Sequence, residues 1–144
     1  MVLASIGFFA LSVFGLGALS VATDRDIIAV EGLGQVPGVV GMILAVVAFA
    51  LSLGATLRRR RPSFGSALVI ALLTALVHLA TLWIAVLAAA ESLIIATAVA
   101  GDLVRGGASA VVLVAAAIAG WSGIALRRTR SERPRWPWEH DEGE

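Results

Sequence analysis

The segment "LTALVHLATLW", residues 73–83, places a single histidine inside an otherwise apolar run, and this run decides the fold. It continues from about residue 66 to residue 89 with no ionisable side chain except His78. A helix that crosses the hydrocarbon core of a bilayer needs roughly 20 apolar residues, because the core is about 30 Å thick and each residue rises about 1.5 Å. Residues 66–89 are therefore predicted to form a membrane-spanning helix.

Three further runs have the same length and character, at residues 2–22, 36–57 and 108–126. They belong to a chain of 144 residues that is 59% hydrophobic and only 15% charged, a balance typical of integral membrane proteins. We expect an all-α integral membrane four-helix bundle over residues 1–126, with short loops. Residues 127–144 form a charged C-terminal tail in this interpretation.

The arginines predict the orientation of the chain. Nine of the eleven basic residues, all of them Arg, lie in residues 58–61 and 127–135. Cytoplasmic loops carry such an excess of positive charge, and the third and fourth spans lie between the two clusters. Both termini are therefore predicted to be cytoplasmic. A composition rich in Ala, Gly, Val and Arg, without Lys, indicates a GC-rich bacterial gene and hence a bacterial plasma membrane.

The end of the third span has two alternatives, because apolar residues continue past Glu91 to residue 100. A single helix over residues 66–100 would be about 52 Å long, well beyond the thickness of the bilayer. We expect the span to end near Glu91 and residues 92–104 to form a short amphipathic helix along the outer interface. Extension of the third span is the alternative.

Small residues recur at alternating steps of three and four in the second and third spans, and the fourth span adds matching positions. A period of 3.5 residues is the repeat of a left-handed helix pair. Small side chains let backbones approach in lipid, where no hydrophobic force drives helices together. We expect these stripes to form the central packing seam. Its predicted residues are Gly38, Gly41, Ala45, Ala48, Ser52, Ala71, Ala85 and Gly120.

His78 falls on the stripe of the third span, which directs it into the bundle. An ionisable side chain at membrane depth is by default a functional candidate, but no span has an Asp or Glu in its middle to complete a proton relay. We favour a neutral imidazole held by hydroxyls or a backbone carbonyl. A proton or substrate role and a metal or heme ligand are the alternatives. The polar candidates within the membrane are His78, Thr74, Thr81 and Ser12.

The residues do not assemble into a catalytic constellation. The chain has no cysteine, and its intramembrane serines and threonines have no acid to complete a triad with His78. A heme would normally need a second axial ligand, and the only other histidine, His140, lies in the tail. We therefore expect no enzymatic activity, no metal site and no cofactor.

The arginine clusters are expected to bind anionic lipid headgroups, at about 1 kcal/mol for each basic residue near the membrane surface. Recognition of nucleic acid is not expected, because the chain offers no fold to support it. For the tail we favour solvated disorder; the alternatives are pairing of its acidic end with residues 58–61 and docking of its "WPW" element on a partner. The predicted headgroup-binding residues are Arg58, Arg59, Arg60, Arg61, Arg127 and Arg128.

The overall plan resembles the small four-span membrane proteins of GC-rich actinobacteria that carry no assigned function. This resemblance covers the whole chain in architecture, and no motif makes it more specific. The small-residue faces and short loops favour a non-enzymatic protein that packs laterally, as an accessory subunit of a larger membrane complex or as a homo-oligomer. The alternative is a small transporter or channel in which His78 lines a pathway between subunits.

Overall fold

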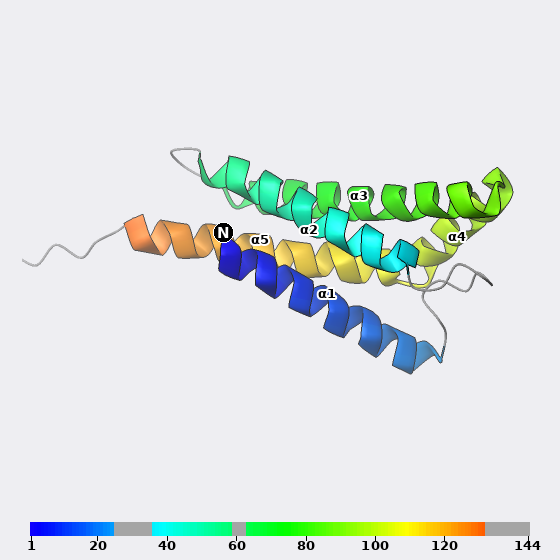
Figure 1. The fold of residues 1–144 in the computed structure, drawn as a ribbon. Coiled ribbons are helices and arrows are strands. Elements are labelled where there is room, and N and C mark those ends of the chain that lie inside the picture. Colours follow the sequence, from blue (N-terminus) through cyan, green and yellow to red (C-terminus); the bar gives the residue numbers. More distant parts are fainter. Residues whose placement is uncertain (25–35, 59–62, 132–144) are drawn as a thin grey trace, which may run out of the picture.

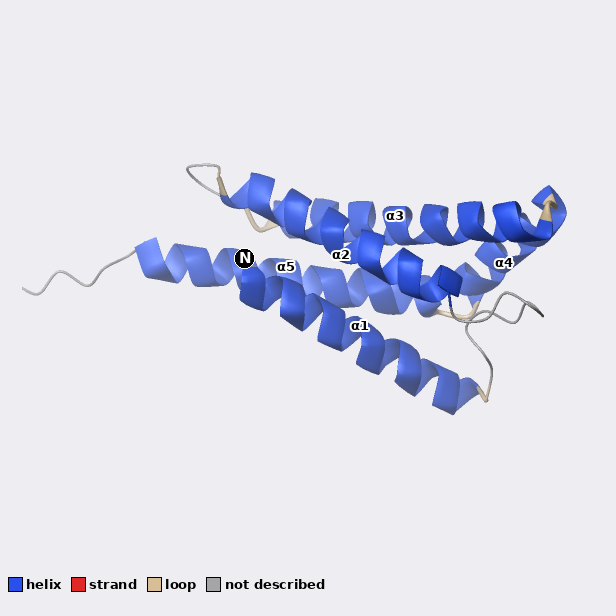
Figure 2. Cartoon of the chain, viewed as in Figure 1, coloured by secondary structure: helices blue, strands red, loops and turns tan. Residues whose placement is uncertain are grey.

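The fold is helical throughout the part of the chain that the structure, a computed structural model, describes: residues 1–24, 36–58 and 63–131. These residues form five helices and no strand (Figures 1 and 2). The helices are α1 (Val2–Thr23), α2 (Val36–Leu57), α3 (Gly65–Ala90), α4 (Leu93–Arg105) and α5 (Ala108–Ser131). The predicted all-α class is confirmed. The predicted tail lies outside the described residues from residue 132 onward.

Four of the helices are long and apolar enough to cross a membrane. They are α1, α2, α3 and α5, each with at least 22 residues in its apolar segment. They are built mainly from apolar residues, and their one proline, Pro37, lies in the first turn of α2, where a helix tolerates it. The prediction of apolar helices compatible with a membrane-embedded protein is confirmed at this level.

Helix α3 is central to the arrangement, because it packs against α2 on one side and α5 on the other. Helix α1 packs mainly against α5, makes fewer contacts with α2, and has no close backbone contact with α3. It lies at the edge of the bundle in Figure 1. Helices α1 and α3 thus occupy one diagonal of the bundle, and α2 and α5 occupy the other.

The third long helix ends at a specific backbone feature. Glu91 has a left-handed conformation, with φ 49°, and its N–H donates to the carbonyl of Leu87. Ser92 then caps the next helix, because its Oγ accepts a hydrogen bond of 3.4 Å from the N–H of Ile95. Residues 93–105 therefore form a separate helix, α4, rather than an extension of α3. This helix buries Ala96 and Leu103 in the bundle.

The apolar core is divided into two clusters along the bundle. The larger one fills the end at which the chain begins, where the rings of Phe8 and Phe49 stack with centroids 4.7 Å apart. The smaller one lies beside α4 and is formed by Leu82, Leu103 and Ala108. The two clusters share a partly buried residue, Leu16 of α1. The buried residues between the clusters are polar.

We predict that Glu91→Val loosens the junction between α3 and α4. A β-branched residue is strained at a φ of 49°, at about 1–2 kcal/mol, whereas glycine adopts this conformation freely. Hydrogen–deuterium exchange of the first-turn amides of α4 should accelerate several-fold. The control Glu91→Gly should exchange no faster than the parent protein. Equal acceleration in both variants would show that the carboxylate, and not the backbone conformation, holds the junction.

Candidate functional site

A band of polar side chains lies between the two apolar clusters. Ser12 and Thr74 are fully buried, and His78 is 3% exposed. The Oγ of Ser109 is also buried, although that residue is partly exposed. We refer to Ser12, Thr74, His78 and Ser109 as the polar band. Three helices contribute to it: α1, α3 and α5.

The position of the band follows from the order of residues on α3. This helix contributes Ala71 to the larger apolar cluster and Leu82 to the smaller one. Thr74 and His78 are the buried residues between them. On α5, Ser109 similarly separates Ala108 of the smaller cluster from the larger cluster that follows.

Contacts between antiparallel helices fix the height of each polar residue. Ala67 of α3 lies against Gly120 of α5. Moving eleven residues along each helix from this contact brings His78 opposite Ser109, since the helices run in opposite directions. The two side chains therefore lie at the same level of the bundle.

The same reasoning places Ser12 near the level of Thr74. Gly123 of α5 lies against Ala4 of α1, and eight residues along each helix bring Ser12 opposite Ala115. By the contact between Ala67 and Gly120, residue 72 of α3 also lies opposite Ala115. Thr74 is two residues further along α3. Two residues of helix amount to about 3 Å along the axis. Ser12 and Thr74 thus lie at similar heights on helices that are diagonal to each other.

The imidazole of His78 packs against Gly41 of α2. A Cβ atom placed on Gly41 of α2 would lie 3.5 Å from Cδ2 of His78 and 3.2 Å from Cγ of Leu82. Any side chain at this position would therefore press against both residues. Because Cδ2 and Nδ1 flank Cγ on opposite sides of the ring, Nδ1 of His78 is directed away from Gly41.

The polar atoms of the band lack hydrogen-bond partners within the described residues. This applies to Ser12 Oγ, Thr74 Oγ1, His78 Nδ1 and Ser109 Oγ. A buried polar group without a partner costs about 1–3 kcal/mol, and lipid offers no partner at this depth. The band therefore has unused capacity to bind a neutral molecule that donates and accepts hydrogen bonds.

Other hydroxyls on the same helices are satisfied by their own backbone. The hydroxyls of Ser52, Thr56 and Thr81 donate to the carbonyl four residues earlier, over 2.7 to 2.9 Å. Thr81, predicted as a polar candidate, is half-buried and bonds to Val77 in this way. The hydroxyls of the band do not use this alternative. In the interior of the described bundle, the hydroxyls of the polar band are the only ones that remain available for another hydrogen-bond partner.

The chemistry of the band is that of neutral hydrogen bonding. It contains two types of hydroxyl and one imidazole, and no carboxylate. Across the described ranges, no group of three or more His, Cys, Asp or Glu is placed to hold a metal ion. Ser109 was not among the residues that the sequence singled out. Its position opposite His78 becomes visible only once the register of α3 and α5 is known.

The predicted packing residues lie at different depths in the bundle. Buried ones are Gly41, Ala45, Ala71 and Gly120, and half-buried ones are Gly38, Ala48, Ser52 and Ala85. In the second half of α2, the fully buried positions are Phe49 and Leu53. They succeed Gly41 and Ala45 at steps of four, which are longer than the 3.6-residue helical turn, so the buried stripe winds around α2 and does not follow the predicted 3.5-residue repeat. The contact face of α2 therefore changes from small to large residues.

The described arginines of the predicted headgroup site lie at one end of the bundle. Arg58 follows the end of α2, and Arg127 and Arg128 lie in the last turns of α5 at the same end (Figure 1). The guanidinium of Arg128 lies 4.8 Å from the centroid of the Phe64 ring, which in turn lies 6.1 Å from that of Trp121. Arg59, Arg60 and Arg61 are outside the described residues.

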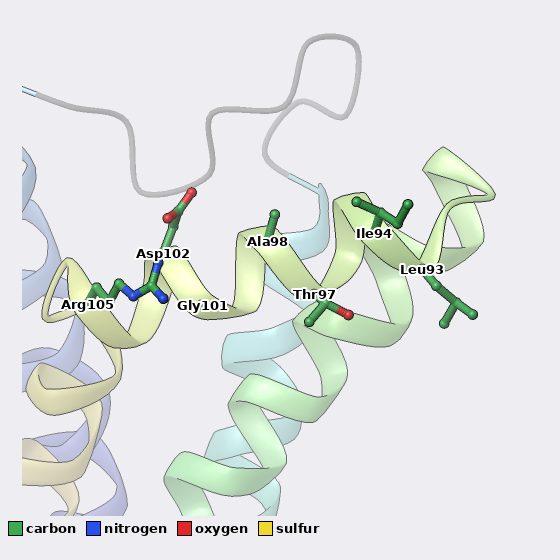
Figure 3. A pocket seen from close by; sticks show the side chains of 7 residues that line it. All are labelled: Leu93, Ile94, Thr97, Ala98, Gly101, Asp102 and Arg105. Atoms are coloured by element: carbon green, nitrogen blue, oxygen red, sulfur yellow. The ribbon is translucent and has the colours of Figure 1, made fainter.

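The opposite end of the bundle carries a shallow hollow on the exposed face of α4 (Figure 3). Leu93 and Ile94 form its apolar side, while Asp102 and Arg105 lie at the other end of the helix. Behind it, Trp83 Nε1 donates a weak hydrogen bond of 3.4 Å to Thr97 Oγ1 and ties α4 to α3. These are features of an amphipathic helix with a charged C-terminal turn.

Together, these observations define a small helical protein compatible with a membrane, with a polar band inside an otherwise apolar bundle. The chain belongs to DUF6121, a family of unknown function, whose sequence profile matches residues 1–144. This membership is consistent with the resemblance to small proteins without an assigned function. No curated protein and no solved structure matches the chain.

We predict that Gly41→Leu destabilises the bundle. The new side chain would overlap Leu82 and the His78 ring, and overpacking of this kind costs about 1–3 kcal/mol. The thermal unfolding midpoint in detergent should fall by several degrees. Ala55→Leu, at an exposed position of the same helix, is the matched control and should leave the midpoint unchanged. An unchanged midpoint for Gly41→Leu would contradict the close contact between α2 and α3.

Proposed function

We propose that this protein is a non-enzymatic component of the bacterial plasma membrane that packs laterally against other membrane helices. Its partner is a larger membrane complex, of which it is an accessory subunit, or further copies of itself. One observation carries the proposal: α1 presents a regular face that no other helix of the described chain covers. We call this face the α1 seam.

The α1 seam has the repeat of a helix–helix contact. Its residues follow one another at steps of four, three, four, three and four, and they combine three small with three large side chains. This 3.5-residue period is that of a left-handed helix pair. The seam consists of Leu3, Gly7, Ala10, Phe14, Gly17 and Val21.

The exposure of the seam supports the proposal. Phe14 is 76% exposed and Val21 is 84% exposed. A Cβ atom placed on Gly7 or Gly17 would have no neighbour within 4 Å, whereas one on Gly41 or Gly123 would touch another helix at 3.2 Å. In lipid, small residues favour association because they let backbones approach. Inside the bundle such residues already serve that purpose, whereas Gly7 and Gly17 of the seam remain unused.

An orientation with both termini in the cytoplasm accompanies the proposal. Arg58, Arg127 and Arg128 share one end of the bundle, and the positive-inside rule assigns that end to the cytoplasm. Helix α4, with Asp102 and Arg105, then lies along the outer interface of the membrane. The amino-acid composition favours a GC-rich bacterium, with actinobacteria as the proposed source.

A small transporter or channel is the second candidate, and the polar band is the observation that favours it. His78 is buried within one chain, so a pathway past it would run through the bundle rather than between subunits. Flux into liposomes tests this candidate. If His78→Ala keeps its fold and oligomeric state but abolishes a measured flux, transport replaces lateral packing as the proposed function.

We predict that Gly17→Leu disrupts lateral association. The added side chain holds α1 away from a neighbouring helix and should weaken association tenfold or more, equivalent to about 1.4 kcal/mol. Native mass spectrometry of the gently solubilised protein, taken from its own membrane, measures the stoichiometry. Ala22→Leu, at an exposed α1 position outside the seam, should leave it unchanged.

Native mass spectrometry of the parent protein also distinguishes an accessory subunit from a homo-oligomer. A larger protein at fixed stoichiometry identifies an accessory subunit, and multiples of the 14.8 kDa chain identify a homo-oligomer. A monomer alone, under conditions that preserve other complexes of the same membrane, would contradict the proposal.

We also predict that Arg127 and Arg128 retain anionic lipid. Replacing both with Gln removes about 1 kcal/mol for each residue and should lower the amount of co-purified anionic phospholipid tenfold or more. Lipid mass spectrometry provides the measurement. Arg105→Gln changes one arginine at the opposite end of the bundle and should leave retention unchanged. Equal losses in both variants would argue against a headgroup site at the end of α5.

A further inference from the structure

The polar band combines three properties that point to a ligand. Its side chains are buried, their polar atoms have no partner in the described part of the chain, and they come from three different helices. Proteins satisfy such groups with buried water, which typically makes about three hydrogen bonds to otherwise unpaired atoms. We propose that the polar band is an internal hydration site in which ordered water links α1, α3 and α5.

The chemistry of the band suits water better than an ion. Ser12 and Thr74 each provide one donor and acceptor oxygen, and Nδ1 of a neutral His78 provides a donor or an acceptor according to its tautomer. No carboxylate or arginine belongs to the band. A small neutral molecule that both donates and accepts hydrogen bonds matches these groups, and water is the smallest such molecule.

The arrangement of the helices gives the water a structural role. Helices α1 and α3 make no close backbone contact, yet Ser12 of α1 and Thr74 of α3 lie at nearly the same height. A water molecule in the interior bridges hydroxyls that are too far apart for a direct hydrogen bond. Water in the band therefore connects the two helices of this diagonal, whose backbones do not approach each other closely.

The apolar clusters on either side confine the water to the band. Toward the cytoplasmic end, the stacked rings of Phe8 and Phe49 close the interior. Toward α4, the smaller cluster of Leu82, Leu103 and Ala108 closes it with fewer side chains. Exchange of the bound water with the bulk is therefore expected to proceed through the α4 end.

Magnetisation transfer from water to the His78 imidazole tests the proposal directly. The chain has only two histidines, so the ¹⁵N-histidine-labelled protein in lipid nanodiscs gives a simple spectrum, and His78→Gln assigns the His78 signal. We expect water transfer at the His78 ring. A His78 signal without water transfer, in a sample that shows transfer at surface amides, would overturn the proposal because the band would be dry.

Three threonine variants distinguish bound water from general loosening of the helix packing. Thr74→Val removes an unpartnered hydroxyl and should lower the transfer at His78 several-fold. Thr81→Val is the matched control, because it removes a hydroxyl on the same helix that is bonded to Val77, and it should leave the transfer unchanged. Thr74→Ser keeps the hydroxyl and should restore the signal.

Equal losses in Thr74→Val and Thr81→Val would overturn the proposal, as would failure of Thr74→Ser to restore the signal. In either case the packing of α3, and not a water held by the Thr74 hydroxyl, would determine the transfer. If Thr74→Val does not fold, Ser12→Ala tests the same site from α1 with a smaller change in volume. It should lower the transfer at His78, and an unchanged transfer would remove α1 from the site and contradict the proposed link.

Discussion

Lipid offers no hydrogen-bond partner, and this constraint governs the structure of the whole chain. Backbone groups must be satisfied within each segment, which is why the described residues are helical. Side-chain hydroxyls obey the same rule, and Ser52, Thr56 and Thr81 bond to their own backbone. The polar band is the exception, since its hydroxyls are buried and have no hydrogen-bond partner within the described residues. The band can form hydrogen bonds with a neutral molecule because the surrounding structure leaves these groups without partners.

Close approach is the second determinant, since packing rather than hydrophobicity holds helices together in lipid. Gly41 brings α2 against His78 and Leu82, and Gly123 brings α5 against Ala4 and Leu53. Helix α1 receives less of this packing, because it contacts α5 on one face and leaves the opposite face uncovered. The bundle is therefore well packed around α3 and incomplete around α1, and this asymmetry is the physical basis for proposing a lateral partner.

The sequence predicted the helices well, because a run of apolar residues as long as the bilayer is thick has few alternatives. Residues 36–57 form a helix with the predicted bounds, and the break at Glu91 coincides with the first charge after the third run. The last helix continues beyond residue 126 to Ser131, since neither Gly nor Pro interrupts that segment. Contacts between helices were harder to predict. Ser109 joins His78 only through the register of α3 and α5, and the α1 seam stands out only when the covered face of α1 is known.

Helix α1 connects the two features that the proposals concern. Ser12 lies on its buried face, whereas Gly17 and Phe14 lie on its exposed face. A helix moves as a rigid element, so a shift of α1 against a lateral neighbour also moves Ser12 relative to Thr74 and His78. No close backbone contact joins α1 to α3, so the packing of α1 against α5 is the main contact that limits such a shift. Bound water can accommodate the displacement by reorienting its hydrogen bonds, which a direct side-chain contact could not do. If the band holds water and the seam holds a lateral neighbour, as proposed above, the two are coupled through the position of α1.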